Sequence, residues 1–154
     1  MKSIMKRVFC STVLIGLLSV LTNCTPSPPP RAAVVPHQGL RTYSNKGNDL
    51  VGIATKSQGA REFETWRTSV AAGSRSPVHS HDSEEIFVIL RGKGQVIIGG
   101  EAYDFEAPCT LIAPANIQHQ FVNTGDVPTD AIVIVGIDSK IYAEDGKPIV
   151  FPWR

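Results

Sequence analysis

The sequence GSRSPVHSHDSEEIFVILRG, residues 73–92, holds the pattern from which both the fold and the chemistry of this protein can be predicted. His79 and His81 stand one residue apart, although the chain of 154 residues has only four histidines. Glu85 follows four residues after His81. Side chains alternate between the two faces of an extended strand, so these three metal-competent groups are expected to point to the same side.

The same face continues into apolar residues, which predicts that it lines the interior. Phe87 and Ile89 share the parity of the histidines, and a second candidate strand carries His119, Phe121 and Asn123 at one parity. If the second strand faces the first across the core, its histidine completes a ligand set. A divalent cation would remove the cost of burying these groups unpaired. The expected ligands are His79, His81, Glu85 and His119, with Phe87, Phe121 and Asn123 lining the pocket.

Taken singly, the histidines also fit ordinary structural roles. A lone buried histidine is usually a hydrogen-bonded core residue, and a histidine pair on a strand is often solvated. Glu85 stands just before an apolar run, and His119 lies between a turn signal and a strand. Together these placements favour a metal site over the structural roles.

Short runs rich in β-branched and aromatic residues recur along the rest of the chain, and turn signals separate them. With 13 glycines and 11 prolines, the composition favours many turns over long helices. The pattern predicts an all-β sandwich or barrel. The expected strands are EFETWRTSV (62–70), EEIFVIL (84–90), QVIIG (95–99), TLIA (110–113), HQFVN (119–123) and DAIVIVGI (130–137).

Two groups of residues resemble the sequence motifs of the cupin superfamily. The first motif is matched in full, at Gly73, His79, His81, Glu85 and Gly92. The second is matched at Pro114, His119 and Asn123, whereas Pro108 and Asn116 stand where the family has glycine. Asparagine tolerates a left-handed backbone but proline cannot, so the turn at Pro108 is expected to differ from the family's. The resemblance covers residues 62–138 and implies a cupin double-stranded β-helix, or jelly-roll barrel, with one divalent metal ion.

Within the superfamily, the chain resembles the germin-like and auxin-binding branch. The similar segments are HSHDSEEIFVILRGKG (79–94), NTG (123–125) and SKIYAEDGKPIVFPW (139–153). In auxin-binding members, a comparable ligand set holds zinc and the metal receives a carboxylate. A C-terminal aromatic residue contributes to their pocket, and whether Trp153 is equivalent stays open. Cys109 is expected to be a small buried residue, with metal ligation as the lesser alternative.

Two classes of function follow from such a site. The first is a metal-dependent oxidoreductase, dioxygenase-like, acting on a small oxygenated compound. The second is a non-catalytic protein that binds or senses a small carboxylate ligand at the metal. A polar group beside the metal, with Glu64, Arg67 and Tyr103 as candidates, would favour the enzyme. A dry pocket closed by aromatic residues near Trp66 or Trp153 would favour the binding protein.

The N-terminus predicts export. A basic segment precedes an apolar run of 14 residues at 8–21, which is shorter than the ~20 residues of a membrane span and typical of a signal peptide. LTNC at 21–24 resembles the lipobox of bacterial lipoproteins, with Asn23 where the family has a small residue. The expected organisation is a signal peptide (1–23), a proline-rich tether (24–39) and a cupin domain (40–154). A plain secretory signal or a retained anchor are the alternatives.

Export also bears on the metal and on the partners. The four ligands suit zinc, manganese, iron, nickel or copper, and oxidising conditions outside the cytoplasm favour zinc or manganese. A net charge of +1 gives no reason to expect a nucleic-acid partner. Ile86, Val88 and Leu90 make the other face of their strand apolar as well. A homodimer that covers this face is therefore expected.

The lipobox hypothesis predicts that Cys24 carries lipid and attaches the periplasm-facing protein to a bacterial membrane. A Cys24→Ser variant should move to the soluble fraction and keep the melting temperature of the parent, because the proline-rich tether contributes nothing to the core. Membrane fractionation checks this. An unchanged distribution between membrane and soluble fractions would show that Cys24 is not the anchor.

Overall fold

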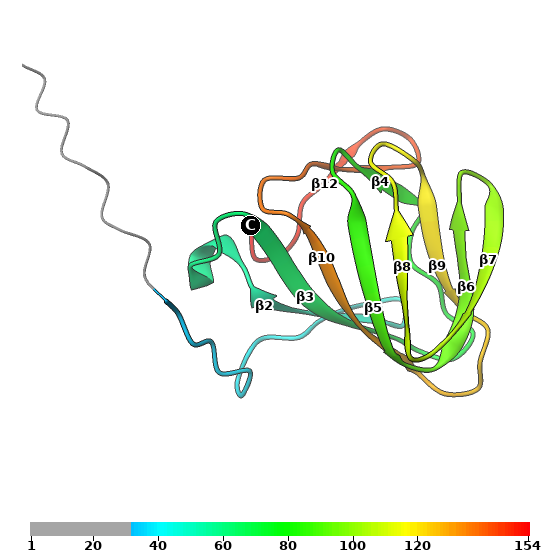
Figure 1. The fold of residues 1–154 in the computed structure, drawn as a ribbon, viewed down its shortest axis with the longest axis horizontal. Coiled ribbons are helices and arrows are strands. Elements are labelled where there is room, and N and C mark those ends of the chain that lie inside the picture. Colours follow the sequence, from blue (N-terminus) through cyan, green and yellow to red (C-terminus); the bar gives the residue numbers. More distant parts are fainter. Residues whose placement is uncertain (1–31) are drawn as a thin grey trace, which may run out of the picture. The chain divides into compact units, whose positions relative to one another are not determined.

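Two six-stranded antiparallel sheets pack face to face in the computed structural model, which describes residues 32–154 (Figure 1). The strand order is β1-β2-β3-β10-β5-β8 in the first sheet and β12-β11-β4-β9-β6-β7 in the second. This is the jelly roll that the sequence predicts. The first sheet contains β1 (Tyr43–Asn45), β2 (Asn48–Ala54), β3 (Phe63–Val70), β10 (Thr129–Gly136), β5 (Glu85–Arg91) and β8 (Cys109–Ala113). The second contains β12 (Pro148–Ile149), β11 (Ile141–Ala143), β4 (His79–His81), β9 (His119–Asn123), β6 (Lys93–Ile98) and β7 (Glu101–Glu106).

The predicted signal peptide, Cys24 and the first part of the tether lie outside the described residues. Residues 32–42 carry no regular secondary structure, and the first strand begins at Tyr43. One short 3-10 helix, η1 (Lys56–Gln58), follows β2. No helix in residues 32–154 is long and apolar enough to cross a membrane.

The core lies between the sheets and is built from alternate residues of the inner strands. Trp66, Phe87 and Ile89 of the first sheet pack with Phe105 and Phe121 of the second, and all are at least nine-tenths buried. Burying each of these side chains contributes roughly 1.5–3 kcal/mol. The alternating pattern therefore predicts β3, β5, β6, β8, β9 and β10 correctly.

The strands that the sequence pattern misses lie at or near the sheet edges. β7 has one buried residue, Phe105, and β12 has two residues in all. β1 and β11 are three residues long. Edge strands cover little core and so lack a period-two apolar signal. Backbone pairing with a neighbouring strand defines them instead.

Residues 79–89 are not one continuous strand, as the parity argument assumes. β4 belongs to the second sheet and β5 to the first, and the chain crosses between them at residues 82–84. Asp82 holds this crossing, because its carboxylate accepts hydrogen bonds from the Lys140 backbone N–H at 2.8 Å and the Ser139 hydroxyl at 2.9 Å. The backbone hydrogen bond from Lys140 lowers the pKa of Asp82. The histidine pair and Glu85 therefore approach the core from opposite sheets.

Gly92 is required by both conformation and space. Its φ of +90° lies in the region that side chains rarely adopt, and a Cβ would approach Thr129 Cγ2 to 2.8 Å. This glycine ends β5 and lets the chain enter β6 in the other sheet. Asn116 has a φ of +63°, as the comparison with the family's glycine implies, and the chain enters β8 after a cis peptide bond between Ala107 and Pro108.

Candidate metal centre

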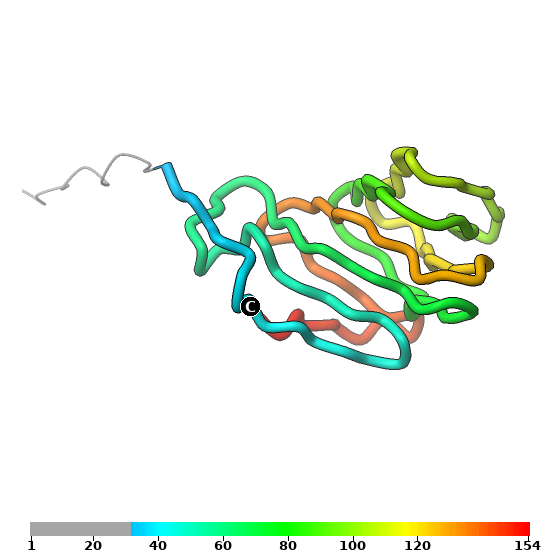
Figure 2. Tube along the Cα trace, turned by 90° about the horizontal axis from the view of Figure 1, so that it is seen from below, coloured from blue at the N-terminus to red at the C-terminus, as the bar shows by residue number. Residues whose placement is uncertain are grey.

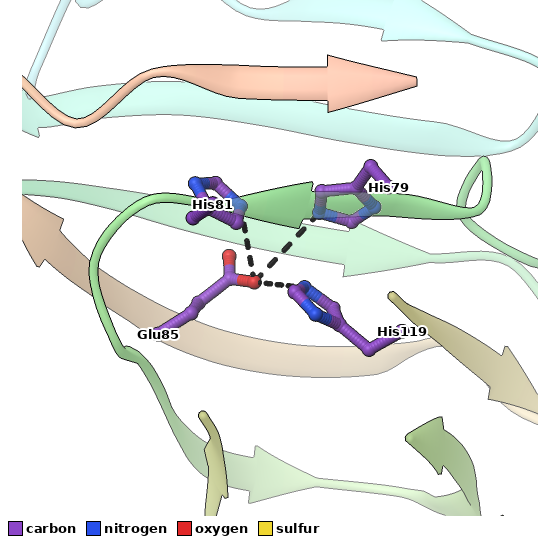
Figure 3. A group of neighbouring side chains, drawn as sticks. All are labelled: His79, His81, Glu85 and His119. Carbon is purple, nitrogen blue, oxygen red and sulfur yellow. Dashed lines mark hydrogen bonds and ion pairs between the residues drawn. The ribbon is translucent and has the colours of Figure 1, made fainter. Parts of the chain in front are cut away.

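Three histidines and one glutamate come together where the two sheets meet (Figure 3). His79 and His81 lie on β4, and His119 begins the adjacent β9, directly opposite His79 in the register. Glu85 begins β5 in the other sheet. His119 is thus beside the first histidine pair rather than across the core from it, and Glu85 supplies the approach from the facing sheet.

The side chains point at a common centre. The Nε2 atoms of His119, His81 and His79 lie 2.5, 3.2 and 3.7 Å from Oε2 of Glu85. One ligand atom from each of the four residues can be chosen so that all lie within 4.8 Å of one another. Ligands about 2.0–2.2 Å from a single ion lie roughly 3–4 Å from one another, so small side-chain shifts would bring this group around one ion. The group therefore has the composition and spacing of a site for one metal ion.

Backbone carbonyls orient two of the imidazoles. His79 Nδ1 lies 2.9 Å from the Pro77 carbonyl oxygen, and His119 Nδ1 lies 3.0 Å from that of Ile117. A carbonyl oxygen can only accept, so Nδ1 carries the proton in both rings. The other nitrogen of each ring, Nε2, faces Glu85 and can bind a cation once it has given up its own proton, as in most histidine metal sites.

His81 provides the test of whether these residues fit a metal. Its side chain is fully buried. Nε2 lies 3.2 Å from Glu85 Oε2 without the geometry of a hydrogen bond, and Nδ1 has no hydrogen-bond partner in the part of the chain that the structure describes. A buried polar atom without a partner costs about 1–3 kcal/mol. A metal ion bound to Nε2 would satisfy one of these atoms. The chemistry of the group therefore fits a divalent cation.

The electrostatics of the group also suit a cation. Burial would raise the pKa of Glu85, but contacts with His119, His79 and His81 outweigh burial and hold this pKa well below its usual range. Burial would lower the pKa of His79, yet its interaction with Glu85 produces a net increase. The ionised carboxylate of Glu85 thus stabilises a proton on His79. A metal ion can replace that proton.

A cavity of about 340 Å³ opens onto this group. His79 and Glu85 reach its surface, and most of the remaining lining is apolar or aromatic. Phe87 and Phe121 line the inner part, and Trp66 and Phe151 lie in the wall.

Asn123, expected in the pocket, does not line this cavity. Its side-chain N–H groups donate to the carbonyls of Val70 and Val127, both at 2.8 Å, and its oxygen accepts from the Gly125 N–H at 2.9 Å. Its side chain therefore holds the turn after β9 and joins it to the end of β3. This explains the burial of a polar residue that shares a face with His119.

The comparison with known proteins supports the fold. Residues 66–135 match the family described as "Cupin domain". These 70 of the 154 residues are thus similar to a cupin domain. It is 29% identical over 96 residues to auxin-binding protein 4 of Zea mays, covering 56% of this chain and 47% of that protein. It is 35% identical over 86 residues to auxin-binding protein 1 of Arabidopsis thaliana, covering 50% of this chain and 43% of that protein.

These alignments span less than half the length of the two curated relatives. Among solved structures, the oxalate decarboxylase of Lactobacillus farciminis superposes with a TM-score of 0.64 at 18% identity, over 69% of this chain and 34% of that one. Similarity at this identity shows the fold alone. The family match and the superposed structure thus both support a cupin fold.

Several residues around the cupin cavity are absent from the sequence prediction. Ser44 and Asn48 come from β1 and β2, and Val150 and Phe151 come from the segment after β12. They lie more than 25 positions from the nearest motif histidine. No local pattern could place them, because their positions depend on how the outer strands close over the sheets.

Replacing His119 by Ala tests whether the two motifs share one ion, because His119 is the ligand outside the first motif. We expect metal affinity to fall at least ~100-fold, since even residues that only support ligands change affinity by 10–100-fold. Metal at 100 times its dissociation constant stabilises the parent by about 2.7 kcal/mol. Chelator should therefore lower the melting temperature of the parent much more than that of the variant.

The matched control is His37→Ala, in the exposed segment before β1. It should leave metal content, measured by mass spectrometry of the purified protein, unchanged. Full metal occupancy and affinity in the His119→Ala variant would disprove the four-ligand site.

Proposed function

We propose that this cupin is an exported protein that binds small apolar carboxylates at a metal ion. One observation carries the proposal: beyond His79 and Glu85, most residues that line the cavity are apolar, and the polar ones are serine, threonine, asparagine and tyrosine, which carry no charge. Among the described residues that line the cavity, Tyr43 is the one titratable side chain besides His79 and Glu85. The pocket is therefore suited to hold an apolar body with a single anionic group.

His79, His81, Glu85 and His119 would hold the cation. A divalent ion at this position would supply a Lewis-acidic partner for a ligand carboxylate. The Pro77 and Ile117 carbonyls keep two of the imidazoles in the tautomer that binds metal. Zinc or manganese are the ions we favour for an exported protein, ahead of iron, nickel or copper.

Aromatic side chains would select the apolar part of the ligand. Phe87 and Phe121 stack with centroids 5.9 Å apart, and the rings of Trp66 and Phe151 lie 4.6 Å apart. Each 100 Å² of apolar ligand surface buried among such rings contributes roughly 2.5 kcal/mol. The names of the two curated relatives also describe binding of a small molecule, auxin.

A metal-dependent oxidoreductase of the dioxygenase type is the second candidate. The cavity gives a substrate access to His79 and Glu85, as either function requires. The polar residues considered for acid–base chemistry do not support it. Glu64 faces a second cavity, Arg67 is exposed on the outside of the first sheet, and Tyr103 is exposed on β7 and donates to Glu101. We therefore favour a non-catalytic binding protein over a metal-dependent oxidoreductase.

The outer face of the first sheet supports a homodimer as part of this proposal. Leu90 and Ile112 are 55% and 54% exposed, and Ile112 lies opposite Ile86 on the neighbouring strand. Ile132 on β10 lies opposite Val88 and extends the same apolar face. A second copy that covers this face would remove these side chains from water.

The binding function predicts that 1-naphthoate binds metal-loaded protein and that 1-naphthalenemethanol does not. The two compounds share an apolar body, but only the first has a carboxylate for the metal. Isothermal titration calorimetry should show at least ~100-fold weaker affinity for the alcohol, because a charged interaction contributes ~2–3 kcal/mol. Binding to the parent should disappear after chelation. Equal affinity for both compounds would contradict carboxylate recognition, and consumption of dioxygen with the acid would favour the oxidoreductase.

The dimer predicts a sedimenting mass twice that of the monomer for residues 40–154 at tens of micromolar. Leu90→Lys together with Ile112→Lys should convert it to monomer, because a buried lysine without a partner is strongly unfavourable. Val127→Lys is the matched control, since Val127 is 46% exposed in the turn before β10, outside this face. A monomeric parent would disprove the dimer.

A further inference from the structure

The segment Pro148–Arg154, here called the closing segment, forms one wall of the metal cavity. It lies beside the strands that begin the domain (Figure 2). Val150, Phe151 and Pro152 line the cavity. Phe151 packs on Trp66, and Trp153 stacks on Phe151 with ring centroids 4.8 Å apart. The position of this segment therefore decides how closed the cavity is.

Few polar contacts hold the closing segment beyond β12. Ile149 pairs with Ile141 of β11. For residues 150–154, the hydrogen bonds within the described structure are a turn bond from the Arg154 N–H to the Phe151 carbonyl and the bonds of the Arg154 side chain. Trp153 Nε1 is buried without an acceptor in residues 32–154. Stacking and Arg154 thus hold the segment.

Arg154 binds a buried carboxylate. Its Nε and Nη2 atoms lie 2.7 and 2.5 Å from Oε2 of Glu64, and Nη1 donates to the carbonyl of Ser139. Glu64 lies on β3, opposite Val135 in the register, and is only 1% exposed. Removing one partner of a buried ion pair leaves an uncompensated charge, which is strongly destabilising. The pair is therefore held in a defined place.

Space behind the closing segment would let it move. A second cavity of about 650 Å³ lies next to the first and is lined by Glu64, Trp153 and Arg154. Ile149 and Val150 line both cavities. The closing segment therefore separates two cavities, and no close-packed core supports the side that faces the second cavity. The Glu64–Arg154 ion pair restrains the segment in place of such packing.

We propose that Glu64 and Arg154 form a latch that positions the closing segment over the metal cavity and slows the entry and release of ligand. Both are positioning residues, since neither lines the metal cavity. The effect on ligand release rests on the proposed function, whereas the effect on the segment does not. Opening would expose Trp66 and Trp153, which are the two tryptophans of the chain.

Tryptophan fluorescence quenching by acrylamide, on the metal-loaded full chain, tests the latch without a ligand. Arg154→Gln should raise the quenching constant at least about twofold, because local opening admits quencher. It also leaves Glu64 buried and unpaired, so the melting temperature should fall. Glu64→Gln combined with Arg154→Gln removes both charges. This double variant should recover most of the melting temperature while its quenching stays high, whereas a merely structural role would move both readouts together.

Lys56→Gln is the matched control. It removes another cation of the second cavity, one that pairs with Asp138 at the exposed rim, and should leave quenching unchanged. Release of 1-naphthoate, followed by stopped flow, should be at least about tenfold faster from the double variant than from the parent. Parental quenching in the double variant would overturn the latch. If the parent binds no 1-naphthoate, the proposed function and the role in ligand release fail, and quenching still decides whether the segment is latched.

Discussion

The buried carboxylate of Glu85 ties the two sheets together at the metal centre. It begins a strand of one sheet and faces three imidazoles carried by the other, so the sheets must close at this point for it to be satisfied. Leaving such a charge buried without partners would be prohibitive. The hydrogen bonds of Asp82 fix the point where the chain leaves β4 and begins β5 in the opposite sheet. This crossing places Glu85 opposite the histidines. The carbonyls of Pro77 and Ile117 complete the arrangement by orienting two rings.

The cavity separates the tasks of holding a cation and recognising a ligand. The ionisable residues His79 and Glu85 lie where the cavity meets the candidate metal site, and most of the remaining wall is aliphatic or aromatic. In the proposed function, a largely apolar wall would exclude water and leave the carboxylate contact at the metal to orient the ligand.

A second buried carboxylate shows how the same fold gives one residue type two roles. Glu64 and Glu85 both lie near the start of inner strands of the first sheet, and β10 lies between those strands. Glu85 faces imidazoles that can exchange protons for a metal ion. Glu64 faces a guanidinium, which keeps its proton and offers a planar set of donors. Both glutamates are buried, so burial does not distinguish their roles. The side chain that each one faces makes Glu85 a candidate metal ligand and Glu64 part of the proposed latch.

Alternation and motif spacing are local properties of the chain, and they were enough to predict the cupin motifs, the all-β class, the inner strands and the four residues that gather at the site. How those residues meet depends on the packing of the two sheets. The parity argument identified Glu85 correctly, although it assumed one continuous strand over residues 79–89. These residues form two strands that lie in different sheets. The role of Asn123, the wall supplied by Phe151 and the pairing of Glu64 with Arg154 depend on contacts between distant segments. No local pattern encodes such contacts, since they arise only when the edge strands close over the core.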